Sequence, residues 1–215
     1  MYEIYHVYNR SIGGSNIFTD DSEYTRFANG IRFYQIEKPK IKYSDFLDQT
    51  IHLAGGLDWQ KFFTGKEKLV EIVAYCLMPT HFHLVIEQLQ DKDGMTSFTS
   101  NLLNSYTRYF NTKYKRKGTL WEGRSKKVII KSNEQFLHLT RYIHLNPVTA
   151  YFVDRPENWP WSSYHEYILE SLEDNKMCSC DDLIGMDRFT YRQFVENGIM
   201  YQRERGRMKS SLPTS

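Results

Sequence analysis

The pattern of hydrophobic and polar residues changes along the chain, and each pattern predicts a different element. Four short stretches rich in β-branched and aromatic residues predict strands, and three longer stretches with apolar residues three or four apart predict helices. The expected strands cover residues 4–8, 70–77, 82–87 and 128–130, and the expected helices cover residues 20–35, 95–114 and 132–146. The turn residues Met78, Pro79 and Thr80 predict a hairpin between the second and third strands.

The order of these elements predicts the fold class. Strand, helix, strand, strand, helix and strand follow one another, which is the βαββαβ order of the ferredoxin-like fold, an α+β fold with one antiparallel sheet. A further helix follows the last strand. We expect residues 1–150 to form one domain, with an insertion at about 37–69 that has no clear period apart from a short helix near 43–47. Residues 151–200 should add a small helical extension packed on this domain, and residues 201–215 a basic, disordered tail.

Composition and charge narrow the class of protein only in part. Of the 215 residues, 40% are hydrophobic, which is enough for a core, and the formal net charge of +2 gives no general argument for nucleic acid. Cations gather instead in a run in which Glu122 is the single anion: Lys113, Lys115, Arg116, Lys117, Arg124, Lys126 and Lys127. A second basic run, at residues 203–209, closes the chain. Such runs are typical of phosphate-binding surfaces, although each also fits a solvated surface.

The sequence also indicates where the protein works. No stretch approaches the ~18 consecutive apolar residues of a membrane-spanning helix, and the first residues lack the basic and apolar regions of a signal peptide. Three cysteines give no disulfide framework. We therefore expect a soluble, cytoplasmic protein with no membrane partner.

Two histidines that lie two residues apart are the clearest candidates for chemistry. Successive side chains in a strand alternate between faces, so His81 and His83 point to one face while Phe82 points to the other. Neutral imidazole is a good ligand for transition metals, and two of them on one face can hold one ion between them. The spacing therefore predicts a metal site, although a pair of this kind can also be incidental.

A tyrosine on the helix after the last strand is the candidate nucleophile. Tyr142 and Asn146 lie four residues apart and so share a helix face, where the amide oxygen of Asn146 can complete the metal site. Pro147 disfavours helical backbone at Asn146, so the helix is expected to end there. His138 shares the face of Tyr142, and His144 faces away. A metal beside a tyrosine hydroxyl is what cleavage of a DNA strand through a covalent phosphotyrosine requires, although a helical tyrosine is also common at the rim of a core.

Five motifs in order give the sequence a resemblance to a known family. They are YHVYNR at 5–10, LMPTHFHLV at 77–85, GTLWEGR at 118–124, RYIHLNPV at 141–148 and WPWSSY at 159–164. The sequence resembles the REP-associated tyrosine transposases, a branch of the HUH single-strand transposases, over about residues 5–167. The insertion before Val70 is the main departure from the family pattern.

The resemblance implies a fold, a cofactor and a reaction. It implies the ferredoxin-like sheet and a divalent ion, Mg²⁺ or Mn²⁺, held by His81 and His83 with Asn146 as the third protein ligand. It also implies Tyr142 as the nucleophile on the extra helix. Members of the family nick single-stranded DNA beside a hairpin and leave a 5′-phosphotyrosine and a free 3′-hydroxyl.

Residues in and near the first basic run are expected to contact the DNA. Trp121 and Arg124 offer base stacking and phosphate pairing, and Lys126 and Lys127 are expected to line the same channel. Arg10, at the end of the first strand, is expected to contact a phosphate or a base near the foot of the hairpin. Trp121 can equally be packed in the core, away from DNA.

Two other functions stay open from the sequence. A domesticated protein can bind hairpin DNA without transposing it, and a metal-dependent hydrolase can use the histidine pair to activate water. The hydrolase is disfavoured because Glu87, the nearest acid, lies ~13 Å from His83 along the strand. The sequence does not decide between a monomer and a homodimer, between the two metals, or among DNA sequences.

Overall fold

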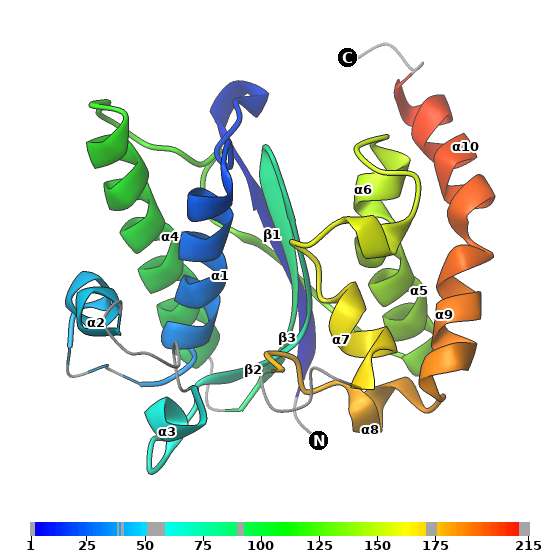
Figure 1. The fold of residues 1–215 in the computed structure, drawn as a ribbon, viewed down its shortest axis with the longest axis horizontal. Helices are drawn as coiled ribbons and strands as arrows, with labels where there is room; N and C mark the ends of the chain where they lie inside the picture. Colours follow the sequence, from blue (N-terminus) through cyan, green and yellow to red (C-terminus); the bar gives the residue numbers. More distant parts are fainter. Residues whose placement is uncertain are drawn as a thin grey trace.

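A single four-stranded antiparallel sheet organises the chain, with helices on both of its faces (Figure 1). The computed structural model describes residues 3–37, 39, 41–50, 59–89, 93–170 and 176–210. The strands are β1 (Ile4–Arg10), β2 (Val70–Met78), β3 (His81–Gln88) and β4 (Lys126–Ile129). The helices are α1 (Asp21–Phe33), α2 (Tyr43–Thr50), α3 (Trp59–Phe63), α4 (Asp93–Lys113), α5 (Asn133–His144), α6 (Asn146–Thr149), α7 (Tyr164–Ile168), α8 (Asp181–Ile184), α9 (Arg188–Glu196) and α10 (Ile199–Ser210).

The sheet confirms the predicted fold class. Its order is β2-β3-β1-β4, and each neighbouring pair of strands is antiparallel. The first strand therefore lies inside the sheet between β3 and β4, as the βαββαβ order requires. This arrangement places the end of β1 beside the start of β3, where the histidine pair begins.

Helices α1 and α4 cover one face of the sheet (Figure 1). Helix α1 begins after Asp20, whose side chain accepts a hydrogen bond from the backbone N–H of Glu23, as an N-cap does. Phe27 and Phe98 are fully buried in the core beneath the two helices. Gly30 lets them approach closely, because a Cβ at this position would lie 3.0 Å from a methyl carbon of Leu102.

Helices α5 to α10 lie on the opposite side of the sheet (Figure 1). His144, the last residue of α5, is fully buried and joins three segments: its Nδ1 lies 2.8 Å from the Tyr191 hydroxyl and its Nε2 lies 2.9 Å from Ser163 Oγ. Burial lowers the pKa of His144 to about 3, so the ring stays neutral. Ser163 Oγ also bonds the backbone of Tyr75 in β2, so the segment after residue 150 is fastened to the sheet.

Two expectations for irregular segments need correction. Part of the insertion packs with the end of α1 in a second, small apolar cluster around α2 and α3, made of Phe33, Ile36, Tyr43, Trp59 and Phe62. The helix near 43–47 is present, but the pattern did not predict α3, and residues 38, 40 and 51–58 lie outside the described residues. The tail expected to be disordered is helical as far as Ser210, because α10 packs on α6. Residues 211–215 are not among the described residues.

The helix that carries Tyr142 also differs from the expectation at its end. It was expected to run to about Asn146, but α5 ends at His144 and α6 begins at Asn146. Leu145, between them, has φ −87° and ψ −2°, and Pro147 occupies the first turn of α6. Proline has no N–H to continue the helical bonding, so a separate turn starts here. No helix in the described part of the chain is long and apolar enough to cross a membrane.

Candidate active site

The histidine pair lies on the face of the sheet that α5 covers. The register of the strands places His81 opposite Arg10 and His83 opposite Tyr8. The two imidazole rings lie 5.2 Å apart between centroids and are nearly perpendicular. Phe82, between them in sequence, packs on the other face against the aromatic core. Alternation along the strand therefore places both rings on one face, as predicted.

Each histidine of the pair is bonded through its Nδ1. His81 Nδ1 lies 3.0 Å from the Thr80 hydroxyl, and His83 Nδ1 lies 2.9 Å from Nε2 of His6. Neither Nε2 atom has a hydrogen-bond partner within the described residues. When Nδ1 carries the proton and donates it, Nε2 keeps a lone pair, which is the arrangement that metal-binding histidines use.

The surroundings keep these imidazoles neutral. Burial lowers the pKa of His81 to about 4, and the charge of Arg10 adds to the effect. Burial also lowers the pKa of His83 well below its usual value, with further contributions from His81 and His6. The pKa of His6 falls to about 4 because of burial. Neutral rings are the form that can bind a metal ion.

His6 and Tyr8 belong to the site although sequence reasoning did not single them out. Their rings stack with centroids 4.8 Å apart, and the His6 ring also stacks on His83 at 5.1 Å. The spacing of two between them in β1 was a signal that they share a face. Only the pairing of β1 with β3 decides that this is the face of the histidine pair.

Tyr142 meets the histidine pair from α5. Its ring lies 5.7 Å from the His83 ring between centroids, in an edge-to-face arrangement, and the residue is 40% exposed. Burial raises the pKa of its hydroxyl, and the neighbouring Cys76 and Tyr8 raise it further. The phenol is therefore protonated at neutral pH, beside the two rings and open to solvent on one side.

Asn146 belongs to α6 and not to the helix of Tyr142. Its side-chain nitrogen is buried without a hydrogen-bond partner, and Asn146 and Tyr142 line the same hollow. The oxygen and nitrogen of an amide are assigned from their hydrogen-bond partners. A rotation of the Asn146 side chain by half a turn would therefore put the amide oxygen where the nitrogen now lies. No group of three or more His, Cys, Asp or Glu that could hold a metal occurs in the described residues. The amide nitrogen of Asn146 is therefore an unpartnered polar group at the hollow that Tyr142 lines.

The two histidines of α5 take different positions. His138 lies near Tyr142, and its Nδ1 is 2.9 Å from a guanidinium nitrogen of Arg141. His144 faces away from Tyr142 into the core, as predicted from its position on the helix.

The basic residues expected to contact DNA are not equally available. Arg10 forms an ion pair with Glu122, and a backbone bond of 3.0 Å from Glu122 N to Arg10 O holds the two segments together. Arg124 is exposed. An approaching phosphate would therefore have to compete with Glu122 for Arg10, whereas Arg124 is open to solvent.

Two expectations about the basic run are wrong. Trp121 is only 6% exposed, and its indole N–H donates to Thr107 at 3.0 Å, so its ring is not available for stacking on bases. Lys126 and Lys127 do not line one channel, because alternation in β4 sends them to opposite faces. Lys126 lies 5.8 Å above the Tyr8 ring on the site face, whereas Lys127 bonds Thr96 of α4 at 3.0 Å.

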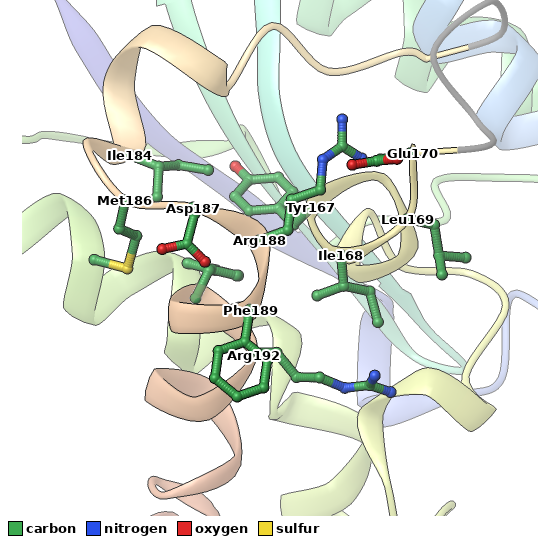
Figure 2. Close-up of a pocket in the computed structure, with 11 residues that line it drawn as sticks. Tyr167, Ile168, Leu169, Glu170, Ile184, Met186, Asp187, Arg188, Phe189 and Arg192 are labelled. Carbon is green, nitrogen blue, oxygen red and sulfur yellow. The ribbon is translucent and has the colours of Figure 1, made fainter.

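A separate hollow lies between α7, α8 and α9, away from these residues. It has a volume of about 720 Å³, and Figure 2 shows Asp187, Phe189 and Arg192 of its lining. None of the predicted site residues lines it. The chemistry described above therefore gathers on the α5 face and not in this hollow.

Comparison with known proteins shows which family part of the chain resembles. Residues 62–146 match the family described as Transposase IS200 like, a range that contains His81, His83, Tyr142 and Asn146. This part of the chain is therefore similar to the IS200-like transposases.

Two curated relatives carry the name of the family that the motifs resemble. A Haemophilus influenzae protein named as a candidate REP-associated tyrosine transposase is 30% identical, over 47% of this chain and 63% of its own. The REP-associated tyrosine transposase of Escherichia coli K12 is 23% identical, over 50% of this chain and 62% of its own. The chain thus spans less than two thirds of the length of either relative.

A solved structure shares the fold. It is that of a REP-associated tyrosine transposase bound to a REP hairpin, with a TM-score of 0.55 and 18% sequence identity. The match covers 80% of this chain and 81% of that one.

Proposed function

We propose that this protein cuts and rejoins single-stranded DNA at hairpins through a covalent bond to Tyr142. The main support for the proposal is the contact between Tyr142 and His83, whose ring centroids lie 5.7 Å apart. This contact puts a nucleophile next to a pair of imidazoles that can bind a metal ion. The names of the similar proteins support a transposase, and the hairpin bound in the related solved structure supports hairpin DNA as the substrate.

The reaction at Tyr142 is a transesterification. The phenol oxygen forms a bond to phosphorus while the bond from phosphorus to the 3′-oxygen breaks, and the phenol proton ends on the departing 3′-hydroxyl. Because burial raises the pKa of Tyr142, this proton leaves only as the new bond forms. The product keeps the phosphodiester energy in the tyrosine bond, so a later 3′-hydroxyl can reverse the step and join strands.

The site residues also fit a divalent ion. His81 and His83 would hold it through Nε2, with the side chain of Asn146 as the third protein ligand. When bound, Mg²⁺ or Mn²⁺ would withdraw charge from the non-bridging phosphate oxygens. Thr80 and His6 fix the two imidazoles through their Nδ1 atoms. Arg124, which is exposed, and Lys126, which lies over the Tyr8 ring, would pair with flanking phosphates.

The direct test is the polarity of a covalent adduct. Purified protein would be mixed with a library of hairpins in manganese and separated on denaturing gels, with the label at either the 3′ or the 5′ end. A 5′-phosphotyrosine predicts that the 3′ label moves with the protein and the 5′ label is released as a shorter strand. The reverse distribution, or no adduct with any hairpin, would contradict the proposal.

His6 offers a prediction that does not depend on cleavage. His6→Phe removes the partner of His83 Nδ1, so His83 is no longer held in the tautomer and orientation that present Nε2. Loss of such a partner lowers metal affinity about 10- to 100-fold, and we expect a loss in this range for Mn²⁺ by titration calorimetry. Tyr5→Phe, on the other face of β1, is the matched control. Unchanged affinity in His6→Phe would show that His6 does not orient the ligand.

A further inference from the structure

The hollow that Tyr142 and Asn146 line is formed in part by residues that the proposed chemistry does not use. It lies between α5, α6 and α10, and we name it the α10 hollow. Its volume is about 440 Å³, within the range of small-molecule sites. Its lining consists of His138, Arg141, Tyr142, Asn146, Thr149, Gly198, Tyr201, Gln202, Arg205 and Gly206. The proposed nucleophile therefore forms part of its wall.

Specific contacts fix the helix that forms the outer wall of the hollow. Gln202 donates to the backbone oxygen of Tyr142 at 3.0 Å, and Arg203 donates to the backbone oxygen of Val148 at 3.2 Å. Gly198 and Gly206 let α10 approach closely, because a Cβ at either position would lie less than 3.0 Å from the facing side chain. Figure 1 shows α10 running beside α6. The hollow is thus a formed feature of the fold.

The charges in the α10 hollow favour an anion. The Arg141 guanidinium lies beside His138 and over the Phe194 ring at 4.4 Å. Arg205 lies near Tyr201, with 3.4 Å between a guanidinium nitrogen and the hydroxyl. Within the described residues neither guanidinium pairs with a carboxylate. Two positive groups therefore remain without a neutralising partner next to Tyr142.

An aromatic ring completes the lining. Tyr201 lines the hollow and is 58% exposed, and the Arg205 guanidinium carbon lies over its ring at 5.7 Å from the centroid. An exposed aromatic ring beside guanidinium groups is the combination that proteins use to bind unpaired nucleotides, with the base on the ring and the phosphate on the cations.

A second hollow continues from the other side of Tyr142. It has a volume of about 530 Å³ and runs between β4 and α5, past His6 and Val128. His138, Tyr142 and Arg205 line both hollows. A single strand that follows the two hollows therefore passes the nucleophile between them.

We propose that the α10 hollow binds the unpaired nucleotide next to the cleaved phosphate, with its base stacked on Tyr201 and its phosphate held by Arg205 and Arg141. This inference rests on the function proposed above, because it makes Tyr142 the point where the strand is cut. It assigns α10 a direct part in holding the substrate.

The test uses a probe that needs no cleavage. A single strand of about 15 thymidines with one 5-iodo-2′-deoxyuridine would be irradiated in complex with the full chain, and the crosslinked peptide identified by mass spectrometry. We expect the crosslink on Tyr201. We also expect Tyr201→Ala to raise the Kd for the strand by about 5- to 150-fold, the effect of losing one base–aromatic stack, and Arg205→Gln to raise it as well.

Matched variants separate this role from a structural one. Tyr201→Phe keeps the ring and should bind like the wild type. Phe189→Ala removes an exposed ring from the α7–α9 hollow, and Arg108→Gln removes a charge from α4 on the other side of the sheet; both should leave the Kd unchanged. A crosslink at another residue, with an unchanged Kd in Tyr201→Ala, would overturn the inference.

Failure of this inference and failure of the proposed function give different results. A covalent adduct with hairpin DNA but no crosslink at Tyr201 would keep the cleavage reaction and remove the nucleotide site. A crosslink at Tyr201 with no covalent adduct would keep strand binding at the α10 hollow and remove the reaction at Tyr142, and with it the assignment of the bound nucleotide as the one next to a cleaved phosphate.

Discussion

Tyr142→Phe is expected to abolish the covalent adduct with hairpin DNA while leaving binding of the DNA largely intact. The substitution removes only the oxygen that forms the bond to phosphorus, and the ring keeps its edge-to-face contact with His83. A phenyl ring has no nucleophile to replace the oxygen, so we expect loss by more than about 10³-fold, the scale on which removal of a catalytic nucleophile acts. Denaturing gels measure the adduct, and fluorescence anisotropy measures the Kd for the same hairpin.

Tyr8 is the matched control because its ring lies almost as close to His83, at 5.8 Å between centroids. Tyr8→Phe should keep the adduct, since Tyr142 and not Tyr8 lines the hollows through which a strand would reach the site. An adduct that maps to Tyr8 would move the nucleophile to β1.

Two further outcomes identify the rival functions. Nicking that survives Tyr142→Phe would indicate a hydrolase that activates water. Binding without an adduct in the wild type would indicate a domesticated hairpin-binding protein.

Lys113→Met is expected to lower the free energy of unfolding by about 2–4 kcal/mol. Lys113 Nζ lies 2.8 Å from Oε1 of Glu23, whose side chain is fully buried, and 2.7 Å from Oδ2 of Asp20. Removing one partner of a buried ion pair leaves an unpaired charge, which costs ~3–5 kcal/mol in a closed core; the expected loss is smaller here because Lys113 is partly exposed. Tyr114 and Thr19 still bond the Glu23 carboxylate. Urea unfolding followed by circular dichroism measures the loss.

A second substitution tests the reason for this loss. Lys113→Met combined with Glu23→Gln removes both charges, so we expect it to be more stable than Lys113→Met alone. Lys117→Met, an exposed lysine of the same run, is the matched control and should change stability little. Equal stability of the single and double variants would contradict a role for the buried charge.

The same cluster predicts a dependence on pH. Bonds from Lys113 and Ser22 lower the pKa of Asp20 from 3.8 to about 2. Burial alone would raise the pKa of Glu23, but its bonds from Lys113, Tyr114 and Thr19 outweigh burial and lower it. A carboxyl group whose pKa is lower in the folded protein than in the unfolded chain stabilises the fold at any pH above its pKa in the unfolded chain. This stabilisation is lost as the pH falls through its pKa in the folded protein. Wild-type stability should therefore fall below pH of about 4, and less steeply in Lys113→Met.

Local patterns in the sequence predicted most of the elements. Asp20 and Ser132 cap α1 and α5 because their side chains bond backbone N–H groups only three residues ahead. Alternation along β3 put His81 and His83 on one face for a similarly local reason. The same rule, applied to β4, separates Lys126 from Lys127. That separation was missed because the strand was expected to begin at residue 128 and begins at Lys126.

The candidate site was only partly predictable. The residues of the histidine pair, Tyr142 and Asn146 were named from the sequence, and the structure places His83 beside Tyr142. The contribution of His6 was not foreseen, since it depends on which strand pairs with β3 and in which register. Burial of Trp121 was also undecided, because its neighbours Phe27, Phe82 and Tyr106 come from three distant segments.

The sequence by itself determined the order of the four strands and the main helices, the sheet class and the position of His81 and His83 on one face, because each follows from spacing over a few neighbouring residues. The tertiary structure decided the contact of His6 with His83, the break between Tyr142 and Asn146, and the packing of α10 beside the site. α10 has no apolar stripe to predict its position, and two glycines and a bond from Gln202 to the backbone of Tyr142 hold it in place. These features depend on contacts between residues far apart in the chain, and such contacts exist only when the whole fold has formed.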